Sequence, residues 1–260
     1  MIDIHNHVLH GLDDGSKDFE TSVAMARAAI DNGITHLVCT PHANDRYPFD
    51  PEANAQKMAA LAACVGGELT LGLGSDFHLS FDMIEDQFRN PAKYTINGKQ
   101  YLLVEFSEHF VPNQMSDLFF RMSGNRVVPI ITHPERNSLL SVHPEQLEPW
   151  LRSGYLIQIT AGSILGRFGK RAEANCKAML EKDWVQVIAS DAHNLTSRSF
   201  LLREAHAKVA KLYGVETADR LCIHNPRAVF YGEALPPQPE PQGISGNAAP
   251  KGFLRRLFSR

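Results

Sequence analysis

Histidines and carboxylates recur in this chain directly after short apolar runs, where they could bind metal ions. His5 and His7 form an H-x-H pair at the end of the first run, IDIH. Asp191 and His193 form a D-x-H pair after the last run, VQVIAS. Side chains at positions i and i+2 lie on the same face of a strand, so each pair can point toward one ion. A single pair of this kind is weak evidence, because such pairs are common by chance.

Further ligand candidates lie at or just beyond the ends of the other apolar runs, or in the loop after the first one: Asp13, Asp14, His42, Asp76, Glu105 and His133. Only the sixth run, YLIQI, lacks such a residue at its end. Capping or core packing would explain any one of them alone. Burying this many ionisable groups together without a cation is costly, so their joint placement favours shared divalent ions. The ligand atoms are all nitrogen or oxygen, which suits Mn²⁺, Fe²⁺, Zn²⁺, Co²⁺ or Mg²⁺ without selecting one.

The elements that must position these side chains alternate between strands and helices. Near-continuous apolar segments are typical of parallel strands buried on both faces, and they occupy residues 2–5, 36–40, 69–73, 101–105, 127–131, 155–159 and 185–189. Helical patterns occupy residues 17–32, 51–65, 115–123, 144–153, 170–182 and 198–213. Ser16 is the expected N-cap of the first helix, and Gly33 lies past its end. This alternation predicts a single-domain α/β barrel, in which the carboxyl ends of the strands meet on one face.

The composition is that of an ordinary globular protein and argues against several classes. The chain has 260 residues, a formal net charge of -3 and 43% hydrophobic residues, so its charge does not point to nucleic acid as a partner. Its four cysteines are scattered without a C-x-x-C pair, which suggests neither a disulfide framework nor a cysteine metal site. No apolar run reaches the ~20 residues that span a bilayer, and MIDIHNH does not resemble a signal peptide. A reducing, cytoplasmic location is therefore expected.

Two arginines follow ligand motifs and could bind a phosphate group. Arg136 lies in THPER and Arg198 in SDAHNLTSR. Arginine makes bidentate contacts to phosphate oxygens, although a salt bridge would explain either residue alone. Cysteine phosphatases use a C-x5-R loop, but six residues separate Cys39 from the following arginine and four separate Cys222 from its own. The sequence also lacks a G-x-S-x-G elbow, a P-loop and a G-x-G-x-x-G motif.

Taken in order, IDIHNH, CTPH at 39–42, VEFS at 104–107, THPER and SDAHN resemble the motifs of the PHP (polymerase and histidinol phosphatase) superfamily. Within it, DIHNHVLHGLDDGSKD and HNPR at 224–227 are similar to the manganese-dependent bacterial tyrosine-protein phosphatases of capsule and exopolysaccharide loci. The similarity covers residues 1–232. The resemblance implies a distorted TIM-like (β/α)7 barrel in a single domain, with three divalent metal ions and Mn²⁺ favoured among the candidates.

The resemblance also divides the ligand candidates among the three ions. The sets are His5, His7, Glu105 and Asp191 for the first ion, bridging Glu105 with Asp76 and His133 for the second, and Asp14, His42 and His193 for the third. The two arginines match family positions suited to phosphate binding. The family usually has Glu in a G-x-E segment where this chain has GSDFH, so Asp76 is one methylene shorter. Asp13 is a possible substitute for Asp14, and His78 and His109 are candidate proton donors.

The implied activity is hydrolysis of phosphotyrosine in a protein, with the tyrosine-rich tail of a bacterial tyrosine kinase as the natural target and capsule or exopolysaccharide synthesis as the setting. Three alternatives stay open. A histidinol-phosphate phosphatase would use the same site. A DNA 3′-exonuclease is disfavoured by the absence of a basic stripe. A non-catalytic module would instead dock on a membrane or a kinase.

The C-terminal part of the chain differs in composition from the rest. Residues 233–250 are rich in Pro, Gln and Gly and are expected to form a flexible linker. Residues 251–260 read KGFLRRLFSR and interleave apolar with basic side chains. This tail is either a peripheral membrane or partner-docking segment or a disordered end.

Overall fold

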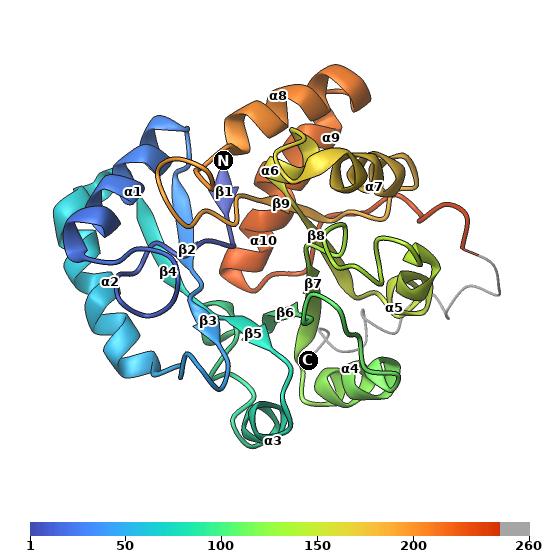
Figure 1. Ribbon diagram of the computed structural model, residues 1–260, viewed down its shortest axis with the longest axis horizontal. Coiled ribbons are helices and arrows are strands. Elements are labelled where there is room, and N and C mark those ends of the chain that lie inside the picture. Colours follow the sequence, from blue (N-terminus) through green and yellow to red (C-terminus); the bar gives the residue numbers. More distant parts are fainter. Residues whose placement is uncertain (245–260) are drawn as a thin grey trace.

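The computed structural model describes residues 1–244, and its strands form two parallel sheets (Figure 1). The smaller sheet has the order β1-β2-β4, with these strands at Ile2–Asp3, His36–Cys39 and Thr70–Leu73. The larger sheet has the order β3-β5-β6-β7-β8-β9, with strands at His42–Ala43, Asp76–His78, Tyr101–Glu105, Val128–Thr132, Leu156–Thr160 and Val187–Ala189. The predicted α/β class with parallel strands is confirmed.

The two sheets continue one another through short breaks in the same chain segments. β2 leads into β3 and β4 leads into β5, where the parallel ladder resumes with His42 opposite Asp76. At the other edge, Asn6 forms an isolated parallel bridge with Ala192, just beyond β9. Within residues 1–244 the strands therefore neighbour one another in chain order, but their hydrogen-bond ladder is interrupted and does not form one closed barrel.

Side chains and a proline interrupt the ladder near the ends of β1 and β2. Asn6 N donates to Thr40 Oγ1 at 2.9 Å, and Asn6 Nδ2 donates to Val38 O at 2.8 Å. Pro41, between β2 and β3, has no N–H to give, and its carbonyl accepts from Asp76 N at 3.0 Å. Because these groups take the place of regular backbone pairs, the strands bend here, and their continuations carry His42 and Asp76 onto the next short strands.

Helices surround the strands on the outside of the molecule (Figure 1). The α-helices are α1 (Phe19–Asp31), α2 (Pro51–Val65), α3 (Phe81–Arg89), α4 (Met115–Gly124), α5 (Glu148–Arg152), α6 (Ala161–Ile164), α7 (Gly169–Glu181), α8 (Leu202–Tyr213), α9 (Val215–Asp219) and α10 (Asn225–Tyr231). Shorter helical turns occur at Gly66–Glu68, Ile96–Gly98, Pro144–Leu147 and Arg220–His224.

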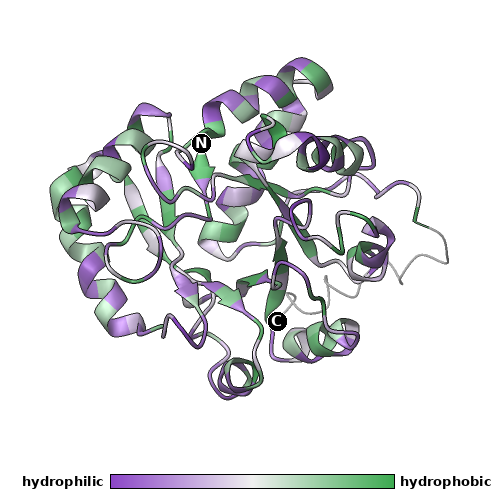
Figure 2. Cartoon of the chain, in the orientation of Figure 1, coloured by the Kyte–Doolittle hydropathy of each residue, from purple (hydrophilic) through white to green (hydrophobic). Residues whose placement is uncertain are grey.

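Two buried hydrophobic clusters hold the strands in place. The larger one packs the helices against the outer faces of the strands and includes Leu37, Leu102 and Ile131. The smaller one contains the alternate residues of the same strands, such as Leu103 and Ile130, together with Val229, Phe230 and their neighbours in and around α10. β7 is largely hydrophobic in Figure 2 because its residues supply both clusters. Burial of both strand faces explains the continuous apolar runs in the sequence.

Most predicted elements are present, with local differences. All seven apolar runs contain a strand, while β3 and β5 are short continuations that periodicity did not indicate. The N-cap prediction for the first helix is wrong, since Asp18 rather than Ser16 accepts from Thr21 N, at 2.8 Å. Gly33 follows that helix with φ of +81°, as expected for a residue past a helix end. The helices α3, α6, α9 and α10 were not predicted.

The segment after α10 runs back along the body of the molecule as far as residue 244. Gln238 exchanges side-chain hydrogen bonds with Asn225 at 2.8 and 2.9 Å. Trp184 Nε1 donates to Gln242 O at 2.9 Å. The predicted basic tail at 251–260 lies outside the described residues. None of the helices in residues 1–244 has the length and apolar character needed to cross a membrane, and all four cysteines, which lie in this range, are free thiols.

Candidate metal centre

The predicted ligand side chains converge at the carboxyl ends of the strands. The groups come from the segment after β1, from β3, β5 and β6, and from the turns that follow β7 and β9: His5, His7, Asp14, His42, Asp76, Glu105, His133, Asp191 and His193. Each of them lies within 4 Å of another member of the set. Asp14 is half-exposed and the others are buried or nearly so. The structure therefore brings together all nine predicted ligands.

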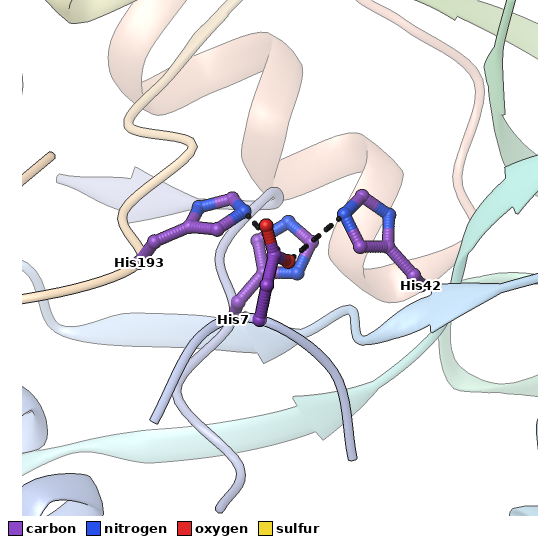
Figure 3. A group of neighbouring side chains, drawn as sticks. His7, His42 and His193 are labelled. Carbon is purple, nitrogen blue, oxygen red and sulfur yellow. Dashed lines mark ion pairs between the residues drawn. The ribbon is translucent and has the colours of Figure 1, made fainter. Parts of the chain in front are cut away.

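One group of four ligand atoms lies at the mouth of the centre. Asp14 Oδ1 is 3.3 Å from His42 Nε2 and 3.5 Å from His193 Nε2. His7 completes the group, with all ligand atoms within 4.8 Å of one another. Figure 3 shows the three imidazoles turned toward a common point. This group contains the three residues that the family resemblance assigns to one ion and adds His7 to them.

A second group lies deeper in the molecule. His5 Nε2 is 3.7 Å from Asp76 Oδ2 and 3.6 Å from Asp191 Oδ1, and His7 Nε2 is 3.5 Å from Asp191 Oδ1. The resemblance places Glu105 in the set with these two histidines. In the structure Asp76, and not Glu105, is grouped with them, next to Asp191.

A third group surrounds Glu105. Its Oε1 is 3.4 Å from His133 Nε2, and its Oε2 is 2.5 Å from His78 Nε2. Asp76 and His42 also border this group. His78, weighed only as a proton donor from the sequence, therefore lies inside the centre. His109, the other candidate donor, is exposed and pairs with Ser138 and Glu108 instead.

Two side chains behind the ligands hold the imidazole rings in orientation. Asp13 Oδ2 accepts from His7 Nδ1 at 2.7 Å and from the backbone N of His42 at 3.0 Å. Gln158 Oε1, on β8, lies 2.7 Å from His5 Nδ1. Such contacts fix the tautomer so that Nε2 faces the ion. Asp13 thus contacts the predicted ligand His7, whereas Asp14 faces His42 and His193, and the sixth predicted strand contributes Gln158.

The donor atoms at the centre fit divalent metal ions. Within residues 1–244, His5 Nε2, His7 Nε2, His193 Nε2 and Asp76 Oδ1 are buried and have no hydrogen-bond partner. A buried polar atom without a partner costs free energy, so this many at one place require a ligand. Imidazole nitrogens and carboxylate oxygens are suitable ligands for the divalent ions expected from the sequence.

The electrostatics point the same way. Burial disfavours the charged form of His5, but the carboxylates of Asp76 and Asp191 outweigh it and raise its pKa to about 9. Burial likewise opposes charge on His42, yet hydrogen bonds that its ring donates to Asp14 and Asp76 raise its pKa to about 11. The carboxylates therefore favour the charged form of these two imidazoles, whereas burial lowers the pKa of His133 and His193. Metal cations bound at this place would supply the positive charge that the carboxylates attract.

The two predicted phosphate-binding arginines both reach the centre. Arg136 Nη1 donates to Asp191 Oδ2, and Arg198 Nη2 donates to the same oxygen at 2.7 Å. Phe168 lies against the Arg136 guanidinium, 4.3 Å from its carbon to the ring centroid. Beside them opens a cavity of about 170 Å³, lined by Glu105, Phe106, Glu108, Thr132, His133, Arg136 and Asn137.

Sequence reasoning missed the contacts of Asp13 and Gln158 with the predicted ligands, and it did not place His78 among the ligand atoms. Gln158 is a polar residue inside an apolar strand, which is a detectable signal. His78 stands two residues after Asp76, and this D-x-H spacing is the one that singled out Asp191 and His193.

Parallel strands whose carboxyl ends gather buried nitrogen and oxygen donors beside two arginines define a candidate polynuclear metal centre on an α/β scaffold. The family described as capsular polysaccharide synthesis, CpsB/CapC, matches residues 1–231, and this chain belongs to that family.

Named relatives are similar over nearly their whole length. The tyrosine-protein phosphatase YwqE of Bacillus subtilis (strain 168) is 32% identical over 246 residues, which cover 92% of this chain and 96% of that protein. The putative tyrosine-protein phosphatase CapC of Staphylococcus aureus is 34% identical over 208 residues, covering 78% and 81%. A solved structure from work on YwqE and on CpsB of Streptococcus pneumoniae, described as unique metal-dependent tyrosine phosphatases, has a TM-score of 0.87 and 31% identity over 95% of this chain and 100% of that one.

Proposed function

We propose that this chain is a metal-dependent protein-tyrosine phosphatase with three divalent ions, Mn²⁺ favoured, at the carboxyl ends of a distorted (β/α)7 barrel. The observation that carries the proposal is the set of buried imidazole and carboxylate atoms without partners, which lies next to Arg136 and Arg198. The names of the relatives that cover the same length supply the substrate class.

The proposed ligands follow the groups in the structure and the sets from the family resemblance. Asp14, His42 and His193 would hold the ion at the mouth. The two deeper ions would share the remaining side chains, which are His5, His7, Asp76, Glu105, His133 and Asp191. When bound, these ions would supply an ionised water as nucleophile and neutralise charge on the phosphoryl group.

The protein's own residues orient the substrate. Arg136 borders both the cavity and Asp191, so its guanidinium can contact a phosphoryl oxygen without leaving the centre. Arg198 lies in the segment after β9 and donates to the same carboxylate, and together the two cations would stabilise negative charge in the transition state. Phe106 offers the phenyl ring of the substrate an apolar contact in the cavity. The tyrosyl oxygen leaves as a phenolate of pKa about 10, so little help from a general acid is required.

The proposed partner is a phosphotyrosine-bearing protein, in particular the tyrosine-rich tail of a bacterial tyrosine kinase. The proposed location of this reaction is the cytoplasm. An extended tail can present one phosphotyrosine after another to an open cavity. Docking through residues 251–260 stays a prediction from the sequence.

A comparison of two substrates tests the proposal. Metal-free protein would be prepared with a chelator, reloaded with Mn²⁺, and assayed for kcat/KM on a phosphotyrosine peptide and on histidinol phosphate. His42→Ala, which removes a proposed ligand, serves as the inactive variant. We expect turnover of the peptide that depends on added metal and is lost in the variant.

Two outcomes would contradict the proposal. A higher kcat/KM for histidinol phosphate would identify the other phosphatase of the superfamily. Fewer than one metal ion per chain by elemental analysis, with no hydrolysis of an aryl phosphate, would favour a non-catalytic docking module.

A further inference from the structure

His78 lies in the metal centre at a position that no predicted ligand set includes. The alternation of β5 places Asp76 and His78 on one face of the strand. The parallel register sets His42 opposite Asp76 and His78 opposite Glu105. Side chains from three neighbouring strands, β3, β5 and β6, therefore meet at this point.

The ligand atoms of these residues are spaced like those around a single ion. His78 Nε2 is 2.5 Å from Glu105 Oε2, 3.1 Å from His42 Nδ1 and 3.7 Å from Asp76 Oδ2. His42 Nδ1 is 2.9 Å from Asp76 Oδ2 and 3.6 Å from Glu105 Oε2. Atoms bound at about 2.0–2.2 Å to a tetrahedral ion lie roughly 3.3–3.6 Å apart. The observed distances, 2.5 to 3.7 Å, fall on both sides of this range, so the atoms surround a space of the size that one ion needs.

His42 and His78 differ in whether they have a ring nitrogen available to bind an ion at this point. His42 turns its Nε2 toward Asp14, at the mouth of the centre. A neutral imidazole has one nitrogen free to bind a metal and carries its proton on the other. With its Nε2 on an ion at the mouth, His42 would carry its proton on Nδ1, which lies 2.9 Å from Asp76 Oδ2, whereas His78 has its Nε2 to offer to an ion.

The side chain at position 76 is short, which favours binding of the ion by His78 as an additional ligand. The G-x-E pattern of the superfamily has a glutamate where this chain has Asp76, whose carboxylate is set back by one methylene. Asp76 is fully buried, and its Oδ1 has no hydrogen-bond partner among the described residues. His78 reaches the same space from two residues further along the strand.

We propose that His78 is a metal ligand of this chain and binds, through Nε2, the ion that Asp76 and Glu105 share. The proposal rests on the proposed metal-dependent function and adds a ligand to it. The competing role for His78 is that of a hydrogen-bond donor to Glu105, which would make it a positioning residue.

Metal binding to variants separates these roles. Metal-free wild type, His78→Ala and His78→Gln would be titrated with Mn²⁺ by calorimetry, and the ions retained after dialysis counted by elemental analysis. His109→Ala is the matched control, because His109 is exposed and outside the centre. The glutamine amide can donate a hydrogen bond from nearly the position of Nε2 but is a poor metal ligand.

If His78 is a ligand, both His78 variants lose one of the bound ions or weaken one site by more than about 100-fold, beyond the 10–100-fold typical of an outer hydrogen bond. The control keeps the wild-type affinities. Wild-type affinity in His78→Gln, or in both variants, would refute the proposal. A wild type that binds no metal would refute the proposed function itself.

A direct measurement on the wild type covers the case in which the variants do not fold. Crystals grown with Mn²⁺ would be examined for anomalous scattering. We expect a peak about 2.0–2.3 Å from His78 Nε2. Peaks at the other ligands with this nitrogen left more than about 3 Å away would overturn the proposal.

Discussion

Replacing Asp13 by asparagine should weaken metal binding although Asp13 is not itself a proposed ligand. Three N–H groups converge on its carboxylate: His7 Nδ1 at 2.7 Å and His42 N at 3.0 Å on Oδ2, and Gly15 N at 2.9 Å on Oδ1. An amide offers only one oxygen and turns its own N–H groups toward the remaining donors. Asp13→Asn therefore leaves at least one buried N–H facing another donor.

The size of the effect follows from these contacts. An unsatisfied buried donor costs about 1–3 kcal/mol, so the free energy of unfolding of the metal-free protein should fall by about that amount. Loss of the contact that fixes the His7 ring should weaken metal binding about 10–100-fold, which corresponds to about 1.4–2.7 kcal/mol. The weakened ions should be those that His7 reaches.

The assay is calorimetric titration of the metal-free variant with Mn²⁺, next to urea unfolding in the presence of a chelator. Asp45→Asn is the matched control, since Asp45 is an exposed aspartate that accepts only from Ser80 Oγ, at 3.1 Å. Affinity within twofold of the wild type in Asp13→Asn would show that the His7 ring does not depend on Asp13. A lower free energy of unfolding with unchanged metal affinity would show that Asp13 stabilises its loop but not the metal centre.

Three further perturbations test other parts of the centre. Phe168→Leu should raise KM for a phosphotyrosine peptide about 3- to 10-fold, because loss of an aromatic contact of about 0.5–2 kcal/mol frees the Arg136 guanidinium. Metal content should stay constant, and Phe168→Tyr should behave like the wild type; an equal rise of KM in Phe168→Tyr would count against stacking. Gly15→Ala should give little folded protein on expression, since the added Cβ would lie 2.3 Å from the carbonyl oxygen of His7 and 2.4 Å from its Cβ; a normally stable Ala variant with full metal content would contradict this packing. Removal of metal by a chelator should lower the midpoint of thermal unfolding, and added Mn²⁺ should restore it in proportion to its excess over Kd; a midpoint insensitive to metal would argue against ions bound only by the folded state.

The sequence could predict which strand ends carry histidines and carboxylates that converge, but not which of these side chains meet. Apolar runs locate buried strands, and the i, i+2 rule locates the paired ligands His5 and His7. The partners of Glu105 depend instead on register between strands, such as the pairing of His78 opposite Glu105. These two residues are far apart in the chain, and no local pattern relates them. For this reason the carboxylates were divided among the ions differently from the groups in the structure.

In the loop after β1, the sequence could not distinguish the roles of two neighbouring residues. Asp13 and Asp14 are adjacent in the sequence and chemically identical, yet one lies behind His7 and the other reaches His42 and His193. The backbone N of Ser16 donates to the carbonyl of His7 at 3.1 Å, so this loop is folded back on the first strand. That contact explains why α1 begins later than its sequence predicted, with Asp18 as its cap.

Backbone conformation at two ligands could not be predicted either. His133 and Asp191, which directly follow or lie just beyond β7 and β9, have positive φ angles of 33° and 53°. Residues other than glycine seldom adopt such angles, because each residue in this conformation costs roughly 1–3 kcal/mol and persists only where the surroundings enforce it. The hydrogen bonds from His133 N to Gln158 O and from Asp191 N to His5 O, both at 2.8 Å, hold these residues in place. A glycine would adopt these angles more readily but would lack the side chain that each proposed ligand brings to the centre.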